Sequence, residues 1–300
     1  AGCGNNGSDG DEGGDGTPAE TGQTQETMDA MGDAADSAGD AARDAAEAAM
    51  GPIEQAVLAN EARTDKQRAR DTYRHPIETL KFFGVEPDMT LAELHPGGGW
   101  YTAILAPMVR DEGTYVGAEY PPSAFDEGSG YRERMEAFPD KIADDPEFYG
   151  DDAMTGDLFA PAGSVDMVLG IRFMHNWIRN DFADEAMQNV YQVLKPGGVF
   201  GVVQHRAPAD SDMSTEELAE TGYVKQSTLI AMAEEHGFTL ADTSEINANP
   251  KDTKDHPQGV WTLPPTLALG DKNREKYLEI GESDRMTLKF VKPEGDAAPM

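Results

Sequence analysis

The sequence has little of three things: cysteine, basic residues and long apolar runs. Its 300 residues contain a single cysteine, Cys3, so no disulfide can form within the chain. Lysine and arginine total 24 against 56 aspartates and glutamates, and the net charge of −32 argues against binding to nucleic acid, or to an anionic membrane through basic side chains. No stretch approaches the roughly 18 apolar residues that a membrane-spanning helix needs. The acidic excess favours solubility.

Large apolar side chains are nearly absent from residues 1–50, which carry twelve acidic residues and one base, Arg43. A segment with so little to bury cannot form a core, so 1–50 is predicted to be an acidic flexible tether with an alanine-rich helix over 27–50. Its first residues, Ala1-Gly2-Cys3, resemble the processed end of a bacterial lipoprotein. The resemblance implies a signal peptide, export, and a lipid anchor on Cys3 in the cell envelope, on the periplasmic side or the cell surface. Without that anchor, the expected location is the cytoplasm.

From residue 51 to residue 300 the pattern is that of one α/β domain. Helices are predicted over 53–63, 65–73, 76–83, 101–109, 131–138, 181–194, 226–236 and 272–280. Strands are predicted over 90–94, 114–118, 153–155, 165–170, 199–204, 238–246 and 286–291. Strands that alternate with helices predict a doubly wound, largely parallel sheet with helices on both faces.

The most informative stretch is 90–119. A short apolar strand runs into Gly97, Gly98 and Gly99, and a helix then leads to a second strand that ends at Glu119. Adjacent glycines let the backbone turn sharply and let a ligand approach where a Cβ would clash. An acid about 20 residues beyond the glycines, at the tip of the next strand, is placed to accept hydrogen bonds from a ribose. The stretch therefore predicts a site for an adenosyl ligand.

Three features together resemble the class I S-adenosylmethionine-dependent methyltransferases, over roughly residues 75–292. They are Glu93-Leu-His-Pro-Gly-Gly-Gly, Glu119, and the turn Leu194-Lys-Pro-Gly-Gly before a strand. Three further sequence motifs resemble those of a family of predicted bacterial methyltransferases that are often exported. They are Arg-His-Pro at 74–76, Met-His-Asn-Trp at 174–177 and Ile-Asn-Ala-Asn-Pro-Lys-Asp at 246–252. The resemblance implies a Rossmann-like seven-stranded sheet with its last strand antiparallel, S-adenosylmethionine as cofactor, and methyl transfer to a small-molecule acceptor.

The resemblance also assigns cofactor contacts by position. Glu93 would help to hold the amino end of the methionyl group, the glycines Gly97, Gly98 and Gly99 would pass under the cofactor, and Glu119 would take the ribose hydroxyls. Asp157, which precedes Leu158, would contact the adenine amine, and Ile171 and Arg172 would lie beside the sulfonium. His95 stands where the family usually has glycine, so a Cβ at this bend, followed by Pro96, is expected to narrow the pocket.

Four residues are candidates for chemistry: Tyr101, His175, Asn176 and His205. His95, His175 and His205 end or follow strands that are neighbours in the expected sheet, so their imidazoles should project near one edge and could exchange protons at neutral pH. Each could equally be a hydrogen-bonded structural group. Arg206 could bind an anionic group of the substrate.

Two other functions remain open. Side chains of His95 or Trp100 that fill the pocket would leave a cofactor-less binding module on a methyltransferase fold. The three histidines could instead hold zinc or copper with an open fourth position. The long segment 247–284 is expected to leave the carboxyl edge of the sheet, with 261–267 folding down as a lid or packing on the side of the domain.

Overall fold

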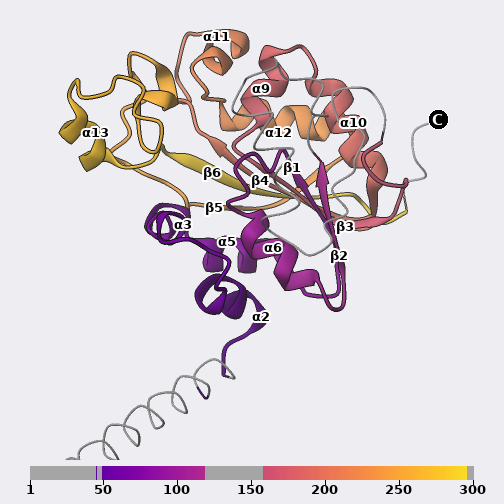
Figure 1. Cartoon of the computed structure of the whole chain (residues 1–300). Helices are drawn as coiled ribbons and strands as arrows, with labels where there is room; N and C mark the ends of the chain where they lie inside the picture. Colours follow the sequence, from indigo (N-terminus) through magenta and orange to yellow (C-terminus); the bar gives the residue numbers. More distant parts are fainter. Residues whose placement is uncertain (1–44, 46–48, 119–157, 296–300) are drawn as a thin grey trace, which may run out of the picture. The chain divides into compact units, whose positions relative to one another are not determined.

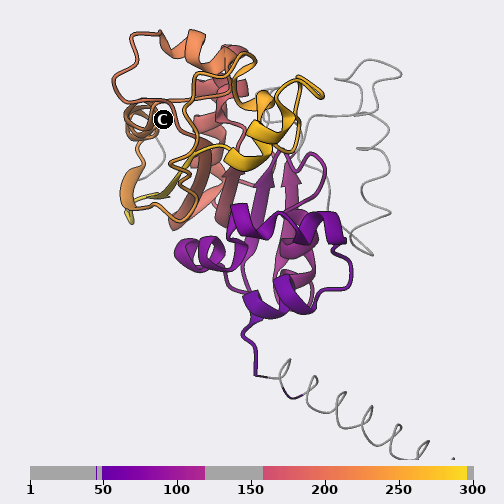
Figure 2. The same ribbon diagram turned by 90° about the vertical axis from the view of Figure 1, so that its left-hand side faces the viewer.

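The structure is a computed structural model that describes residue 45 and residues 49–118 and 158–295 (Figures 1 and 2). Cys3, almost all of the predicted tether, Glu119, Asp157, the helix predicted over 131–138 and the strand predicted over 153–155 lie outside these residues. The elements below all belong to the unit Gly51–Met300. In the part that the structure describes, no helix is long and apolar enough to cross a membrane.

The six described strands form one mixed sheet in the order β2-β1-β3-β4-β6-β5. They are β1 (Thr90–Leu94), β2 (Thr114–Ala118), β3 (Val165–Ile171), β4 (Leu194–His205), β5 (Thr239–Ser244) and β6 (Arg285–Val291). Neighbours from β2 to β4 run parallel, whereas β6 runs antiparallel between β4 and β5. The Rossmann-like α/β class and the antiparallel last strand are therefore as predicted. The predicted seventh strand, over 153–155, lies outside the residues that the structure describes.

The described helices are short. They are α2 (Pro52–Glu54), α3 (Asp65–Arg68), α4 (Asp71–Arg74), α5 (Pro76–Phe83), α6 (Thr102–Val109), α9 (Met174–Arg179), α10 (Ala183–Val193), α11 (Thr215–Glu220), α12 (Gln226–Glu235) and α13 (Arg274–Ile280). A π-helical turn, η1 (Gln55–Ala59), follows α2, and a 3-10 turn, η3 (Gly259–Thr262), precedes α13. The helix predicted over 53–63 is observed as α2 followed directly by η1, and it ends at Ala59. The helix predicted over 65–73 is observed as two short helices, α3 and α4.

Helices cover both faces of the sheet (Figure 1). Along β1, Leu91 packs in a cluster with residues of α5 and α6, while Ala92 and Leu94 pack with residues of α9, α10 and α12. Successive side chains of a strand point to opposite faces, so a strand buried on both sides reads as a continuous apolar run. This double burial explains why the apolar stretches at 90–94 and 165–170 marked strands in the sequence.

Two predicted boundaries are wrong for backbone reasons. Asp181 was expected to cap the helix over 181–194, but it has φ +54° and the helix begins after Phe182. The Lys-Pro-Gly-Gly turn was expected before a strand beginning at 199, but β4 already starts at Leu194. Its pairing with β3 jumps from Val165↔Leu194 to Met167↔Val199. The turn is therefore an irregularity inside the strand, with Gly197 at φ +79°.

Candidate functional site

A cavity of about 320 Å³ lies where β1, β3 and β4 end. In Figure 2, strands β1 and β2 point toward the gold segment that contains residues 250–284, and part of this segment forms another wall of the cavity. Ligands in open α/β sheets bind outside the carboxyl ends of the strands, and pockets for small molecules have volumes of about 300 Å³ or more. The cavity therefore has both the place and the size for a small-molecule site.

Most of the residues predicted from sequence meet at this cavity. Its lining includes all four catalytic candidates, Tyr101, His175, Asn176 and His205, and six of the cofactor candidates, Glu93, His95, Gly97, Gly98, Ile171 and Arg172. Gly99 is buried but does not line it, and Leu158 packs against the hydrophobic core. Glu119 and Asp157 lie outside the described residues. The strand ends thus bring together side chains that are more than 100 positions apart.

The bend after β1 has a glycine-like backbone even at its histidine. His95 has φ +50°, and Gly97 and Gly99 follow with φ +59° and +69°. The imidazole stacks on Phe173 with ring centroids 3.5 Å apart, and Trp177 donates a hydrogen bond from Nε1 to its Nε2 over 3.1 Å. His95 therefore makes the turn that glycine would make, and its ring forms part of the wall without filling the cavity.

Gly98 is an exposed residue of the cavity lining with open space beside its backbone. A Cβ added at this residue would meet no atom within 4 Å, and its backbone is not in the left-handed region. Trp100, the other side chain that could have plugged the site, also lines it. Its indole donates from Nε1 to the Gln67 carbonyl oxygen over 3.0 Å. The space beside the glycines is the kind that close approach of a ligand to backbone requires.

The carboxylate of Glu93, which lines the cavity, accepts two hydrogen bonds from neighbouring elements. Thr102 donates from Oγ1 to its Oε2 over 2.6 Å, and the Tyr115 hydroxyl donates to the same oxygen over 2.7 Å. The residue is 3 % exposed. These two bonds join β1 to α6 and β2, so the carboxylate has a fixed orientation at the cavity wall.

His175 and His205 form a neutral pair, with ring centroids 5.7 Å apart. Burial lowers the pKa of His175 to about 4, despite its contact with the Gln204 side chain, whose Nε2 lies 3.3 Å from Nδ1. Burial and the neighbouring His175 lower the pKa of His205 well below its usual value. The His205 Nδ1 lies 2.5 Å from the Ser283 hydroxyl. Both imidazoles are therefore uncharged at neutral pH and can exchange hydrogen bonds with a ligand.

The hypothesis of a metal held by His95, His175 and His205 is wrong for the part of the chain that the structure describes. There, no three histidine, cysteine, aspartate or glutamate side chains lie close enough together to hold a metal ion. The imidazole of His95 is instead engaged by Phe173 and Trp177.

An arginine cluster at one end of the cavity escaped the sequence analysis. Glu282 accepts hydrogen bonds from Arg70 Nε at 2.6 Å, from Arg285 Nη1 at 3.1 Å and from Arg74 Nε at 3.3 Å. Burial raises the pKa of Glu282, but attraction by cations, led by Arg74 and Arg285, outweighs it and lowers the pKa to about 2. Arg172 adds a further guanidinium to the cavity wall. Arg70 and Arg74 lie more than 200 positions from Glu282 in the sequence, so no local spacing could reveal the cluster.

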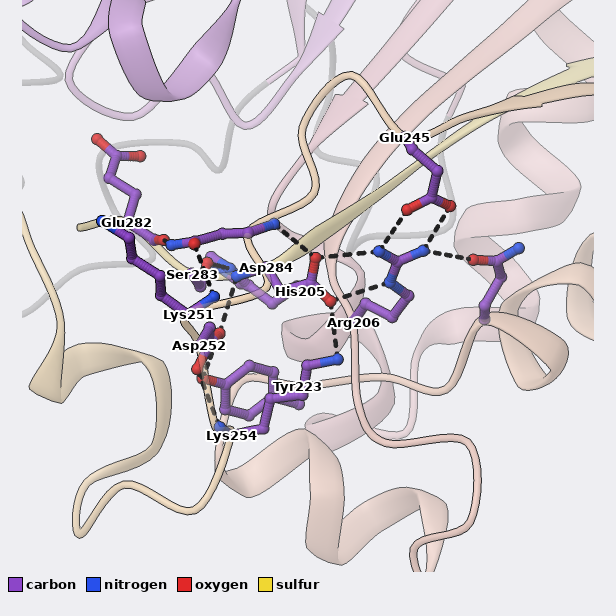
Figure 3. A network of polar contacts seen from close by, with 12 residues as sticks. His205, Arg206, Tyr223, Glu245, Lys251, Asp252, Lys254, Glu282, Ser283 and Asp284 are labelled. Carbon is purple, nitrogen blue, oxygen red and sulfur yellow. Dashed lines mark hydrogen bonds and ion pairs between the residues drawn. The ribbon is translucent and has the colours of Figure 1, made fainter. Parts of the chain in front are cut away.

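The Arg206 side chain, expected to bind an anionic group of the substrate, is instead paired with two carboxylates of the chain. Its guanidinium is occupied by Glu245, through two bonds of 2.7 Å, and by Asp284, through two bonds of 3.0 Å (Figure 3). Arg206 does not line the cavity. In the same network, Asp252 accepts from the Tyr223 hydroxyl at 2.9 Å and from the Asp284 backbone N–H at 2.8 Å. These bonds fix the strand entrance at 282–284, which carries Glu282 and Ser283 to the cavity.

The predicted lid segment borders the cavity. Val260, Trp261, Pro264, Pro265 and Thr266 all line it. The Trp261 ring lies edge-on to His175, with centroids 5.8 Å apart, and the Arg179 guanidinium lies 5.8 Å from the Trp261 ring centroid. The segment therefore covers the site as expected and does not pack on the side of the domain.

Comparisons with known proteins place the fold but not the activity. No family model and no curated protein matches the chain. A protein from Galdieria sulphuraria, assigned as a sarcosine dimethylglycine methyltransferase, matches at a TM-score of 0.50 and 15% identity, over 76% of this chain and 88% of that one. A SAM-dependent methyltransferase from Aquifex aeolicus matches at 0.46 and 14% identity (81% and 99% covered), and the [4+2]-cyclase SpnF at 0.49 and 18% (79% and 85% covered). The chain therefore has a methyltransferase-like fold, a type of scaffold that hosts more than one chemistry.

Proposed function

We propose that this protein is an S-adenosylmethionine-dependent methyltransferase that acts on a small molecule. The observation that carries the proposal is the open cavity above Gly97 and Gly98, at the carboxyl ends of β1, β3 and β4. The side chains of His95 and Trp100 line this cavity and do not fill it, which disfavours the alternative of a cofactor-less binding module. At about 320 Å³ the cavity suits one compact ligand group, and residues 119 and 157 would complete the binding site for the nucleoside part of the cofactor.

The residues present fit the methionyl half of this cofactor. Gly98 leaves open space for close approach, and the Arg74 side chain at the cavity wall has two buried terminal nitrogens, Nη1 and Nη2, without a hydrogen-bond partner. Such donors suit a carboxylate. Glu119 and Asp157 are proposed to hold the ribose and the adenine amine, as their sequence positions imply.

The bound cofactor would supply an electrophilic methyl group to a lone pair of the acceptor, and the electron pair of the broken carbon–sulfur bond would remain on sulfur. Tyr101, His175 and Asn176 are proposed to orient the acceptor, because the three line the cavity on its β3 and α6 sides. Where the acceptor carries a proton, the uncharged imidazole of His175 or His205 accepts a hydrogen bond from it. Trp261 and the prolines beside it shield the site from water.

Titration calorimetry with S-adenosylmethionine tests the proposal. The wild type should bind, and Glu119→Ala should weaken binding at least tenfold. A graded pair at Gly98 provides the structural test, since its Cβ enters open space. Gly98→Ala should bind more weakly than wild type and Gly98→Leu should not bind, while both keep the wild-type circular dichroism spectrum. A folded wild type that gives no heat at millimolar cofactor would contradict the proposal and favour the binding module.

A further inference from the structure

The arginine cluster has more hydrogen-bond donors than the described residues satisfy. Arg74 is 1 % exposed and lines the cavity, yet its Nη1 and Nη2 have no partner among the described residues. The Nε atom of Arg172, another lining residue, is also buried and without a partner there. A buried N–H group without an acceptor is destabilising, and more so when it is charged. Two residues that line the cavity therefore carry buried donors without an acceptor, although the Arg74 guanidinium also lies over the Trp100 ring, 4.4 Å from its centroid.

The charge of the cluster is also out of balance. Arg70, Arg74, Arg172 and Arg285 stand against two carboxylates, Glu282 and Glu93, even when Glu93 is counted as ionised. Glu282 is already shared by three of the four guanidinium groups. Two of these arginines, Arg74 and Arg172, line the cavity itself, in a chain that has only 24 basic residues against 56 acidic ones. Buried cations of this kind call for an anion.

The proposed cofactor does not restore the balance. S-adenosylmethionine has one carboxylate but also an ammonium and a sulfonium, so it brings a net positive charge into the cavity. Its carboxylate can accept from one guanidinium and leaves the other without an anion. The second ligand of the site must therefore supply the missing negative charge.

We infer that the methyl acceptor is an organic acid, a small molecule whose carboxylate is held by Arg172, which follows the end of β3, while Arg74 holds the carboxylate of the cofactor. This inference rests on the proposed function, because only that function requires a second ligand. A carboxylate matches the fork of guanidinium donors, and each arginine can give it two hydrogen bonds. Tyr101 and Asn176 line the same cavity and can bind the rest of the acceptor.

Binding of simple dicarboxylates, without cofactor, tests the anion site. Malonate and succinate, at constant ionic strength, should bind in titration calorimetry and raise the melting temperature, whereas the neutral amides malonamide and succinamide should do neither. Arg172→Gln should weaken dicarboxylate binding at least tenfold. Arg110→Gln removes the same charge at an exposed position and should leave it unchanged. Arg74→Gln is a second variant, to be used where its circular dichroism matches the wild type. Equal behaviour of acids and amides, or undiminished binding in Arg172→Gln, would overturn the inference.

The cofactor separates this inference from the proposed function. S-adenosylmethionine has one positive charge more than S-adenosylhomocysteine, so succinate should bind at least about fivefold more tightly in its presence than with the uncharged thioether, and the coupling must be reciprocal. Cofactor binding without dicarboxylate binding would overturn the acid acceptor and leave methyl transfer standing. Dicarboxylate binding without cofactor binding would support the anion site and overturn the methyltransferase.

Discussion

Trp177 and His95 join helix α9 to the bend after β1, because the Trp177 indole donates to His95 Nε2 over 3.1 Å. The histidine holds φ +50°, a conformation that costs a residue with a Cβ about 1–2 kcal/mol relative to glycine. The stacking on Phe173 and the indole bond offset this strain. The histidine thus keeps the geometry of a glycine bend and gives the cavity an aromatic wall.

Substitutions of His95 should separate strain from contact. His95→Ala loses the ring contacts but keeps the strained backbone, and we expect it to lower the free energy of unfolding by about 1–3 kcal/mol. His95→Gly loses the same contacts and relieves the strain, so it should be about 1 kcal/mol more stable than the alanine variant. Urea denaturation measures both. If alanine were as stable as glycine, the positive φ would not be a source of strain.

Stability should fall as the pH is lowered from about 6.5 to 4. His175 has a pKa of about 4 in the folded protein and about 6.5 in the unfolded chain, so the unfolded state binds more protons in this window. Lowering the pH to 5 should therefore cost about 2 kcal/mol through this group, at about 1.4 kcal/mol per pH unit. Thermal melts from pH 7.5 to 4.5 check this.

His175→Gln is the matched variant for this pH effect. Glutamine keeps a polar side chain but does not titrate, so the slope of stability against pH between 5 and 6.5 should flatten. His205, whose pKa is also lowered by burial, leaves a residual slope of the same sign. A variant with the wild-type slope would mean that His175 does not titrate in this range.

Local patterns predicted the sheet well because its strands are buried on both faces. β1 and β2 have the predicted bounds, since each is an apolar run between polar or glycine residues. α5 also has its predicted bounds, with Pro76 at its first turn and Gly84 at φ +82° after its last. Many of the residues that line the cavity were then predicted from their positions at strand ends, because parallel strands end at a common edge of the sheet.

The rest of the site depends on contacts between distant parts of the chain. Arg74 was noticed only as part of a motif, and its partner Glu282 lies 208 positions away. Arg206 was expected to meet a substrate because it follows a strand end, but Glu245 and Asp284 surround it. His256 lies in a loop, where it is buried against Asp252, with 2.8 Å between Nε2 and Oδ1. Pairing of charges across a fold leaves no periodic signal in the sequence.

Removing the carboxylate of Glu282 should destabilise the fold strongly. Glu282→Gln leaves the buried guanidinium groups of Arg74 and Arg285, and the partly exposed one of Arg70, without their common anion, and breaking a buried ion pair typically costs about 3–5 kcal/mol. Glu245→Gln is the control, since Glu245 also pairs with an arginine but its side chain is 67% exposed. That variant should lose no more than about 1 kcal/mol. Equal losses in urea denaturation would contradict a special role for the buried cluster.

Two glycines should differ in how much stability they lose when the same methyl group is added. A Cβ at Gly201 in β4 would lie 2.7 Å from a side-chain carbon of Leu169 and 2.8 Å from one of Phe83, both in the core. Gly201→Ala should therefore lower the free energy of unfolding by about 1–3 kcal/mol, the usual result of overpacking. Gly98→Ala places its methyl group in open space and should change stability by less than about 0.5 kcal/mol. Chemical denaturation of both variants would show whether Gly201 is kept for packing and Gly98 for the cavity. A loss of more than 1 kcal/mol in Gly98→Ala would mean that the space beside it is filled in solution.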